Sequence, residues 1–172
     1  MKETTSCRII TAVINMATKT NAVRLVLQAG IPCREEFYEY DENDLNGNHA
    51  AKAIGFPPEQ VFKTLVARGA RTGINVFCIP VCCELDLKKA AKAAGDKNME
   101  MVAVKELLGL TGYIRGGCSP VGMKKRYPTY IDETCQIHDE IALSAGERGH
   151  QMLIPFEAIL QLANANLADI IA

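Results

Sequence analysis

The sequence lacks an excess of charge of either sign, because 19 Lys and Arg residues balance 20 Asp and Glu residues in a chain of 172. This balance excludes a global basic field as the basis for nucleic-acid binding, so a local cluster must supply any such contact. One group, Lys88, Lys89 and Lys92, is expected to be the solvated face of a helix. A second group is a candidate phosphate contact, with a solvated turn as the alternative; it comprises Arg115, Lys124, Lys125 and Arg126.

Long hydrophobic runs are also missing, and none approaches the roughly 18 residues that a membrane-spanning helix needs. Residues 1–16 contain a short apolar patch, but Glu3 precedes it and no convincing cleavage site follows, which argues against a signal peptide. Because Met16 directly precedes a segment that reads as a natural start, we expect residues 1–16 to be an extension outside the fold. Residues 17–172 are then long enough for one domain with one core, without disulfides or metal.

The seven cysteines lack any pairing pattern. Their number is odd, and they form neither a C-x-x-C pair nor a Cys/His ligand spacing, which argues against a disulfide framework and a metal site. Free thiols fit a reducing cytoplasm. We interpret Cys78, Cys82 and Cys83 as small core residues in or after a strand, with a redox role as the less favoured alternative.

A local signature for a catalytic triad is absent as well. His49, His138 and His150 have no neighbouring Ser or Cys arrangement, and we interpret them as structural or surface residues. Cys118 is an alternative nucleophile, because backbone donors in its Gly-rich loop would lower its pKa. A buried thiol is the simpler interpretation of this residue.

Hydrophobic spacing, caps and turn residues predict a mixed order of helices and strands without repeats or an internal linker. This order is typical of an α+β domain with paired strands and helices outside them. Helices are expected from residue 20 or 21 to 29, around 50–54, over 87–94 between Asp86 and Gly95, around 105–110, and over 156–163. Strands are expected over 35–41, with Tyr38 and Tyr40 on one face, and in two pairs, 61–67 with 74–81 and 140–144 with 150–154.

Lys63 is the most informative residue, because it places one cation at the centre of an apolar, strand-like segment. Alternation puts Lys63 on the face of Val61 and Leu65. An ammonium among apolar neighbours is rarely kept unless it meets a negative partner or ligand. The alternative is a lysine on an edge strand that extends to water.

The segment that begins at Thr111 is rich in Gly, Pro and Tyr and indicates a compact functional loop. Gly116 and Gly117 would let backbone N–H groups approach a ligand, and Ser119 with Pro120 would fix the exit of the loop. An ordinary tight turn is the alternative interpretation.

Taken together, several separated segments resemble the YbaK family of aminoacyl-tRNA deacylases, relatives of the editing domain of bacterial prolyl-tRNA synthetases. The similarity covers residues 17–172. It implies an α+β fold around a mixed, mostly antiparallel, barrel-like sheet, and no cofactor. The segments are NAVRL from residue 21, YEYD from 38, QVFKTL from 60, ELDLKKAAKAAG from 84, TGYIRGGCSPVGMKKR from 111, YID from 130 and SAGERG from 144.

The resemblance implies release of cysteine mischarged on tRNA(Pro), and possible action on Cys-tRNA(Cys), with prolyl-tRNA synthetase as a possible partner and no role for DNA or a membrane. In such relatives the thiol of the substrate attacks its own carbonyl, so no enzyme nucleophile is needed. Lys63 would hold the tRNA terminus and the amides of Gly116 and Gly117 would bind the carbonyl. Arg115, Lys124, Lys125 and Arg126 would contact RNA, and the substrate pocket would comprise Tyr38, Asn46, Thr64, Ser119, Pro120, Asp132, Ser144 and Gln151.

Two positions depart from the pattern of the relatives. An aromatic pocket residue is replaced at Leu45 or Asn46, and Gln151 stands where an acidic residue is expected. Loss of a pocket carboxylate would alter amino-acid preference or rate. Two alternatives therefore stay open: a deacylase for another small amino acid, such as Ala-tRNA(Pro), and a non-catalytic RNA- or protein-binding module.

Overall fold

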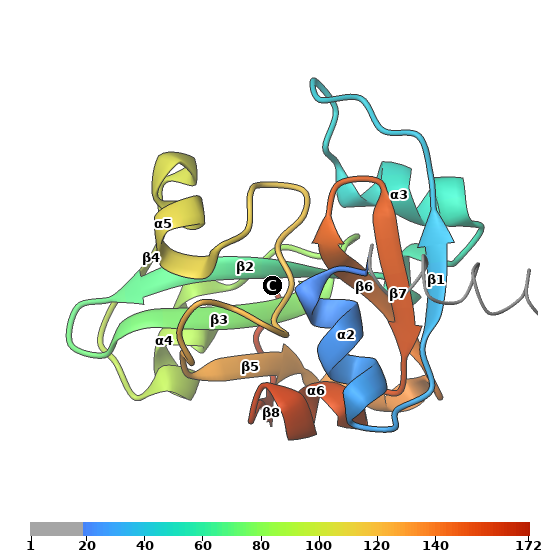
Figure 1. Ribbon diagram of the computed structural model, residues 1–172. Helices are drawn as coiled ribbons and strands as arrows, with labels where there is room; N and C mark the ends of the chain where they lie inside the picture. The colour runs from blue at the N-terminus through green and yellow to red at the C-terminus, as the bar shows by residue number, and fades with distance from the viewer. Residues whose placement is uncertain (1–18) are drawn as a thin grey trace, which may run out of the picture.

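The computed structural model describes residues 19–172, and the extension predicted for residues 1–16 lies outside these residues (Figure 1). The strands are β1 (Arg34–Phe37), β2 (Phe62–Gly69), β3 (Gly73–Pro80), β4 (Met99–Met101), β5 (Thr129–Asp132), β6 (Ile141–Glu147), β7 (His150–Ile154) and β8 (Asn166–Ala168). The α-helices are α2 (Asn21–Gln28), α3 (Gly47–Ile54), α4 (Leu87–Ala94), α5 (Leu107–Thr111) and α6 (Glu157–Leu162). Three short 3-10 helices are η1 (Pro58–Gln60), η2 (Val104–Glu106) and η3 (Glu133–Ile137).

The strands form two sheets, with the orders β1-β7-β6 and β4-β2-β3-β5-β8. Pairing is antiparallel except between β3 and β5 and between β5 and β8. One bridge, between Val61 and Ala142, links the end of the larger sheet to β6. The α+β class and the mostly antiparallel pairing are therefore confirmed. The barrel-like form is not confirmed, because within the described residues the strands form two sheets that meet at one bridge and do not close.

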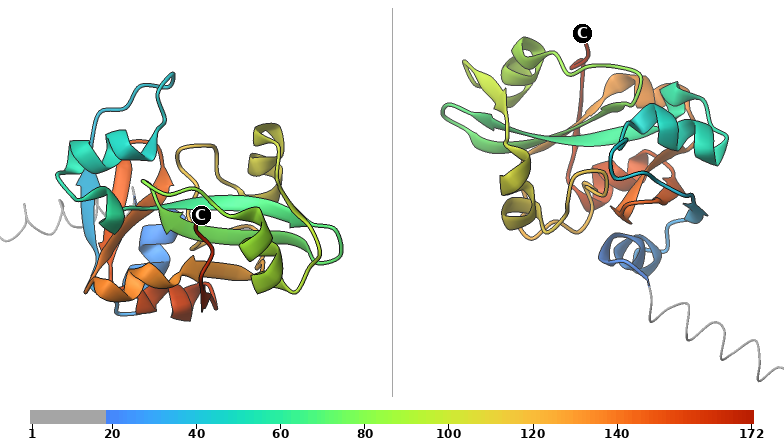
Figure 2. Two further views of the ribbon diagram at one scale, coloured as in Figure 1. Left: turned by 180° about the vertical axis from the view of Figure 1, so that it is seen from behind. Right: turned by 90° about the horizontal axis from the view of Figure 1, so that it is seen from above.

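The two faces of the larger sheet pack against different helices, because side chains alternate along β2 and β3. Ala67, Phe77 and Ile79 pack with α4 and with Ile170 near the C-terminus. Val66 and Val76, whose side chains lie on the opposite face, pack with α5 and the loop after it. Figure 2 shows α4 and the C-terminus on one side of the β2–β3 hairpin and α5 on the other.

Helix ends follow the predicted signals closely. The Asp86 carboxylate accepts hydrogen bonds from the N–H groups of Lys88 and Lys89 at the start of α4, and Gly95 ends this helix with a φ of 71°. Gly55 ends α3 in the same left-handed conformation, with a φ of 76°. Side-chain capping and a glycine stop are local interactions, so the sequence alone indicates them.

Two local predictions need correction. The strand expected over 35–41 ends at Phe37, because the chain turns away after the Tyr38 N–H donates to the Gly149 carbonyl. Tyr40 therefore lies beyond the strand and is exposed. Cys82 is exposed as well, not a core residue, because it occupies the turn that follows β3. In the described part of the chain, no helix is both long and apolar enough to cross a membrane.

Candidate functional site

A cavity of about 620 Å³ lies where the two sheets meet. It forms because β4 pairs with β2 only from Ala67 to Gly69, which leaves the preceding half of β2 without a strand on that side among the described residues. The floor comes from β2, β6 and β7, and the walls come from the loop before α3, the β4–α5 segment and the loop after α5. The site therefore depends on elements that are distant in sequence.

Lys63 of β2 lines this cavity, as predicted. Its Nζ lies 3.9 Å from the Glu84 carboxylate, and this is the only ion pair of Lys63 within the described residues. The Lys63 side chain is 27% exposed, whereas that of Glu84 is 88% exposed. An exposed pair at this distance is weak. The ammonium is thus available to an anionic ligand that enters the cavity.

Polar side chains from the smaller sheet line the same cavity as Lys63. Gln151 is only 6% exposed, and its Nε2 lies 3.5 Å from the Tyr38 hydroxyl. The Gln151 Oε1 is buried and has no hydrogen-bond partner among the described residues. Ser144, also at the cavity, accepts a hydrogen bond from the Gly146 N–H. A buried acceptor without a partner costs free energy unless a ligand pairs with it.

The loop after α5 brings glycine backbone to the cavity, and its two glycines differ in role. Gly116, with a φ of 84°, lines the cavity. The Gly117 N–H donates to the Ile114 carbonyl within the turn, 3.0 Å away, so this amide is already engaged. A Cβ at Gly117 would lie 3.0 Å from backbone atoms of Glu147. Gly117 therefore allows the loop to approach the β6–β7 turn, and Gly116 contributes backbone to the cavity lining.

Asn46 and Thr64, two residues predicted for the substrate pocket, also line the cavity. Asn46 also caps α3, because its Oδ1 accepts from the Asn48 N–H at 2.9 Å. The Thr64 hydroxyl lies 3.8 Å from the Cys78 sulfur. Of the two positions, Leu45 and Asn46, where an aromatic side chain was expected, Asn46 thus has a structural reason for Asn, since Asn is a favoured N-cap residue.

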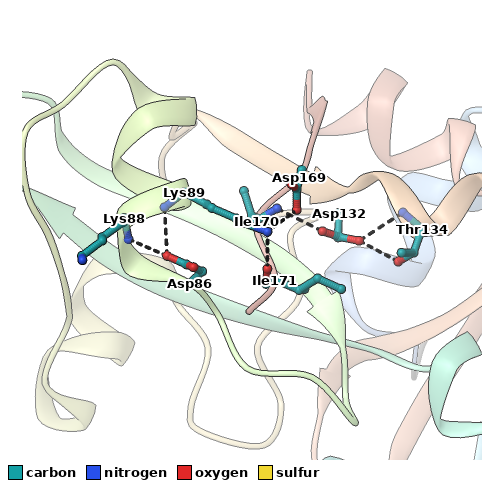
Figure 3. A network of polar contacts seen from close by, with 8 residues as sticks. All are labelled: Asp86, Lys88, Lys89, Asp132, Thr134, Asp169, Ile170 and Ile171. Atoms are coloured by element: carbon teal, nitrogen blue, oxygen red, sulfur yellow. Dashed lines mark hydrogen bonds and ion pairs between the residues drawn. The ribbon is translucent and has the colours of Figure 1, made fainter.

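Three residues predicted for the substrate pocket lie outside its lining: Ser119, Pro120 and Asp132. Ser119 is fully buried, and its Oγ accepts from the Val121 N–H. Asp132 is 1% exposed and accepts from the Thr134 N–H and hydroxyl and from the Ile170 N–H. Figure 3 shows Asp132 between Thr134 and the C-terminal segment. These contacts make Asp132 a structural anchor for the end of the chain.

The predicted RNA-binding cluster is divided by the fold. Arg115 is exposed and lines the cavity, and its carbonyl accepts a hydrogen bond from Arg148 Nε at 2.9 Å. Lys124, Lys125 and Arg126 are exposed but lie outside the cavity lining. Their segment is held against α5, because the Tyr127 hydroxyl donates to the Leu110 carbonyl at 2.7 Å.

Cys118 touches the cavity, but its chemistry does not suit a nucleophile. The residue is 8% exposed, and burial raises the pKa of its thiol to about 11. A thiol with a raised pKa is largely protonated at neutral pH and is a poor nucleophile. Within the described residues, the cavity lining contains no histidine that could serve as a base for Cys118 or Ser144.

Sequence reasoning missed Glu84, which lines the cavity, and Arg148, which lies outside its lining but connects adjoining segments. Glu84 belongs to a segment that carried the family resemblance, but only the turn after β3 brings it near Lys63. Arg148 forms an ion pair with Glu42, 3.6 Å away, and so connects the β6–β7 turn to the loop before α3. An apolar wall at the other end includes Met101, Val104 and Leu107. No local pattern distinguishes these residues from ordinary surface or core positions.

Comparisons with known proteins agree on one family. The model of the aminoacyl-tRNA editing domain matches residues 47–162. A protein of Enterococcus faecalis, named provisionally as the Cys-tRNA(Pro)/Cys-tRNA(Cys) deacylase EbsC, is 48% identical over 88% of this chain and 93% of its own. A proline–tRNA ligase of Shouchella clausii is 31% identical over 60% of this chain, which corresponds to 18% of that protein.

Solved structures show the same fold. A crystal structure described provisionally as a trans-editing enzyme for prolyl-tRNA synthetase is 26% identical, with a TM-score of 0.74 over 88% of this chain and 95% of that one. The crystal structure of the hypothetical protein APE2540 has a TM-score of 0.80 at 18% identity, over 89% of this chain and all of that one. The similarity to APE2540, at 18% identity, is evidence for the fold alone.

Proposed function

Since this chain belongs to the aminoacyl-tRNA editing domain family, we propose that it is an aminoacyl-tRNA deacylase that acts in trans to release cysteine mischarged on tRNA(Pro). Its action extends to Cys-tRNA(Cys), the second substrate in the name of the Enterococcus faecalis relative. The observation that carries the proposal is a weakly paired Lys63 ammonium in a cavity of about 620 Å³ at the junction of the sheets. Pockets for small ligands typically enclose about 300–1,000 Å³.

Lys63 holds the anionic end of the tRNA in this proposal. The aminoacyl group is esterified to the terminal ribose, so a phosphate lies close to the reacting ester. A phosphate in the cavity would replace the exposed Glu84 carboxylate as the partner of Lys63. The ester is then fixed relative to the β2 edge, and orientation of this kind in intramolecular reactions is worth effective concentrations on the order of 10⁵–10⁸ M.

The substrate supplies the nucleophile. The cysteine sulfur attacks its own carbonyl carbon, the bond from that carbon to the ribose oxygen breaks, and the thiol proton passes to the ribose oxygen. The products are a four-membered thiolactone and tRNA with a free terminal hydroxyl. This route fits a cavity in which Cys118 is buried with a raised pKa. In this proposal Gly116, which lines the cavity, donates its N–H to the carbonyl oxygen, where negative charge develops.

Gln151 recognises the amino acid in this proposal. Its buried Oε1 lacks a partner and lies at the cavity, so it can accept a hydrogen bond from the substrate ammonium. Tyr38, Ser144, Thr64 and Asn46 shape the same space. A neutral amide acceptor discriminates through hydrogen-bond geometry, because it provides no full charge for the ammonium.

The tRNA follows exposed basic residues away from the cavity in this arrangement. Arg115 lies at the mouth, and Lys124, Lys125 and Arg126 lie beyond it next to α5. Such contacts with phosphates provide affinity without reading sequence. We place this activity in the cytoplasm, where tRNA is charged, with prolyl-tRNA synthetase as the enzyme whose errors it removes.

A deacylation panel tests the proposed function. The protein is incubated separately with Cys-tRNA(Pro), Ala-tRNA(Pro), Ser-tRNA(Pro) and Cys-tRNA(Cys), and the released product is identified by mass spectrometry. We expect fast loss of cysteine and slow loss of alanine and serine, since neither of these carries a thiol. Preferential release of alanine would assign the chain to the alternative deacylase class. Binding of all four without release would indicate a non-catalytic module.

Trapping of the product tests the mechanism separately. A thiolactone reacts with an added amine such as hydroxylamine to give an acyl adduct of cysteine, whereas direct hydrolysis gives free cysteine. Because hydroxylamine also cleaves the aminoacyl ester itself, the adduct formed without the protein is subtracted. The matched substrate is tRNA(Pro) charged with S-methylcysteine, which has nearly the same shape but no free thiol. Release of S-methylcysteine at the rate of cysteine would contradict attack by the substrate thiol and would leave the deacylase function intact.

A further inference from the structure

Cys82 and Cys83 form a pair of adjacent thiols directly beside the cavity. Their sulfur atoms lie 3.9 Å apart in the turn that follows β3. Cys82 is exposed and Cys83 is half-buried. The residues on either side of the pair, Val81 and Glu84, both line the cavity. The proposed deacylation makes no use of these two thiols.

The other described cysteines cannot offer a comparable pair. Cys78, Cys118 and Cys135 are buried, and burial raises the pKa of their thiols to about 12, 11 and 12 respectively. Burial also raises the pKa of the Cys33 thiol to about 11. A reagent in solution therefore reacts with the exposed Cys82 thiol before the thiols of Cys33, Cys78, Cys118 and Cys135. Cys83 lies next to Cys82.

We propose that Cys82 and Cys83 form a dithiol site for monosubstituted trivalent arsenicals, and that occupation of this site lowers turnover in the adjacent cavity. The reaction joins R–As=O to two thiols. Two As–S bonds form, the As=O bond breaks, and its oxygen leaves as water with the two thiol protons. Arsenic remains trivalent, so the reaction needs neither an oxidant nor a reductant. Sulfur donors suit a soft, thiophilic centre of this kind.

The two thiols act in sequence. Cys82 is exposed and attacks first. The pKa of the Cys83 thiol is raised, by burial first and by the hydrogen bond with Cys82 second, which would slow its reaction with a separate molecule. The second As–S bond is intramolecular, however, and linkage of two contacts strengthens binding by about 10²–10⁴-fold.

Two ligands from the protein are sufficient, because the arsenic keeps its organic substituent as the third. This matches the surroundings, since no group of three or more Cys, His, Asp or Glu residues suited to a metal ion occurs in the described part of the chain. The site is therefore suited to a centre that needs two sulfur ligands and unsuited to a metal ion that needs three or four.

Binding of an arsenical to the two thiols affects the cavity through Glu84, the residue that follows Cys83. Its carboxylate lies 3.9 Å from Lys63 Nζ, and its carbonyl accepts a hydrogen bond from the Ala172 N–H. Bridging the two sulfurs fixes the turn between β3 and this anchored residue. It also places the organic substituent of the arsenical beside the mouth of the cavity. This effect on turnover rests on the proposed function, whereas the binding site does not.

Intact-mass measurement of the full chain with phenylarsine oxide tests the binding site. We expect one phenylarsine per chain, with the loss of one water relative to the two reactants. Cys82→Ser and Cys83→Ser should each weaken binding about 100-fold, and the matched variants Cys7→Ser and Cys33→Ser should not. Dithiothreitol should remove the adduct, whereas 2-mercaptoethanol at equal thiol concentration should not. An adduct unchanged in Cys82→Ser, or one that the monothiol removes, overturns the dithiol site.

Deacylation of Cys-tRNA(Pro) by the phenylarsine adduct tests the effect on turnover. We expect at least a fivefold loss of rate in the parent protein and no loss in Cys83→Ser at the same reagent concentration. Full activity of a stoichiometric adduct overturns the coupling to the cavity. If the unmodified protein has no deacylase activity, the proposed function fails instead, and the mass measurement still decides whether the dithiol site exists.

Discussion

Lys63 Nζ and the Glu84 carboxylate lie 3.9 Å apart at the edge of the cavity, and their side chains differ greatly in exposure, at 27% and 88%. Exposed ion pairs contribute less than about 1 kcal/mol to stability. Glu84 is therefore a weak partner of the lysine, and in the proposed function a phosphate takes its place.

Replacement of the central cation is the most direct test of the site. We expect Lys63→Ala to lower kcat/KM for Cys-tRNA(Pro) by about 100- to 1,000-fold, the range found when a charge-stabilising group is removed from an active site. Circular dichroism and thermal melting should match the parent, because the lysine makes only one weak ion pair within the described residues. The matched control is Lys88→Ala, on the exposed face of α4. Parent activity in Lys63→Ala would remove this residue from the mechanism.

The thiol in the Gly-rich loop is expected to be dispensable. Cys118→Ala should deacylate Cys-tRNA(Pro) at the parent rate, because burial raises the pKa of this thiol to about 11. Loss of the buried sulfur should lower the free energy of unfolding by about 1 kcal/mol. The measurement is single-turnover deacylation together with chemical denaturation. A loss of rate above tenfold in a fully folded variant would restore Cys118 as a nucleophile.

Gln151 should have opposite effects on activity and stability. Gln151→Leu has a similar volume and removes a buried acceptor that lacks a partner, so the free energy of unfolding should stay equal or rise. Deacylation should fall about tenfold to 100-fold, which corresponds to the 1–3 kcal/mol of an unpaired polar group on the substrate. Gln151→Glu keeps an acceptor and should keep activity. Equal activity in Gln151→Leu would show that the substrate makes no contact there.

The basic cluster should affect binding rather than chemistry. The triple variant Lys124→Ala/Lys125→Ala/Arg126→Ala should weaken tRNA binding and reduce the slope of log affinity against log salt concentration by about 2–3, with kcat unchanged. Filter binding over a range of salt concentrations measures this slope. Lys88→Ala/Lys92→Ala/Lys97→Ala removes as many exposed charges from the α4 region and should leave the slope intact. Equal slopes for both triples would place the RNA elsewhere.

Asp132 should matter for stability alone. Asp132→Ala leaves the N–H of Thr134 and that of Ile170 without their acceptor, and we expect a loss of about 2–3 kcal/mol in the free energy of unfolding. Exposed Asp139 is the control, with no measurable change in Asp139→Ala. The folded fraction of Asp132→Ala should retain parent kcat. A selective loss of kcat at full stability would return this residue to the substrate pocket.

Local signals explain which parts of the fold the sequence predicts well. The start and end of α4, the β2–β3 hairpin that pairs Lys63 with Ile79, and the β6–β7 hairpin all follow from caps, turn residues and short-range alternation. Three strands were not predicted: β4, β5 and β8. Each has only three or four residues, and β5 and β8 pair in parallel with distant strands, so neither a turn nor a long periodic pattern marks them.

The residues of the candidate site also differ in how far local sequence signals predict them. Lys63 was singled out because a cation in an apolar strand is unusual, and the family resemblance then assigned it to the pocket. The pocket assignment of Asp132 rested on a sequence resemblance, and the structure places this carboxylate under the C-terminal segment because it satisfies backbone donors there. The position of Glu84 beside Lys63 and the exposure of Cys82 both depend on the direction of the turn that follows β3. That direction is fixed by tertiary packing.

By itself the sequence determined the helix caps, the two long hairpins and the presence of a lysine inside an apolar strand, because each of these depends on residues close in the chain. Only the tertiary structure decided that the two sheets remain separate, that the first half of β2 has no strand on one side among the described residues, and that Gln151, Gly116 and Glu84 line the same cavity as Lys63. The physical reason is that a cavity is the space left where packing between distant elements stops, and no local interaction encodes it.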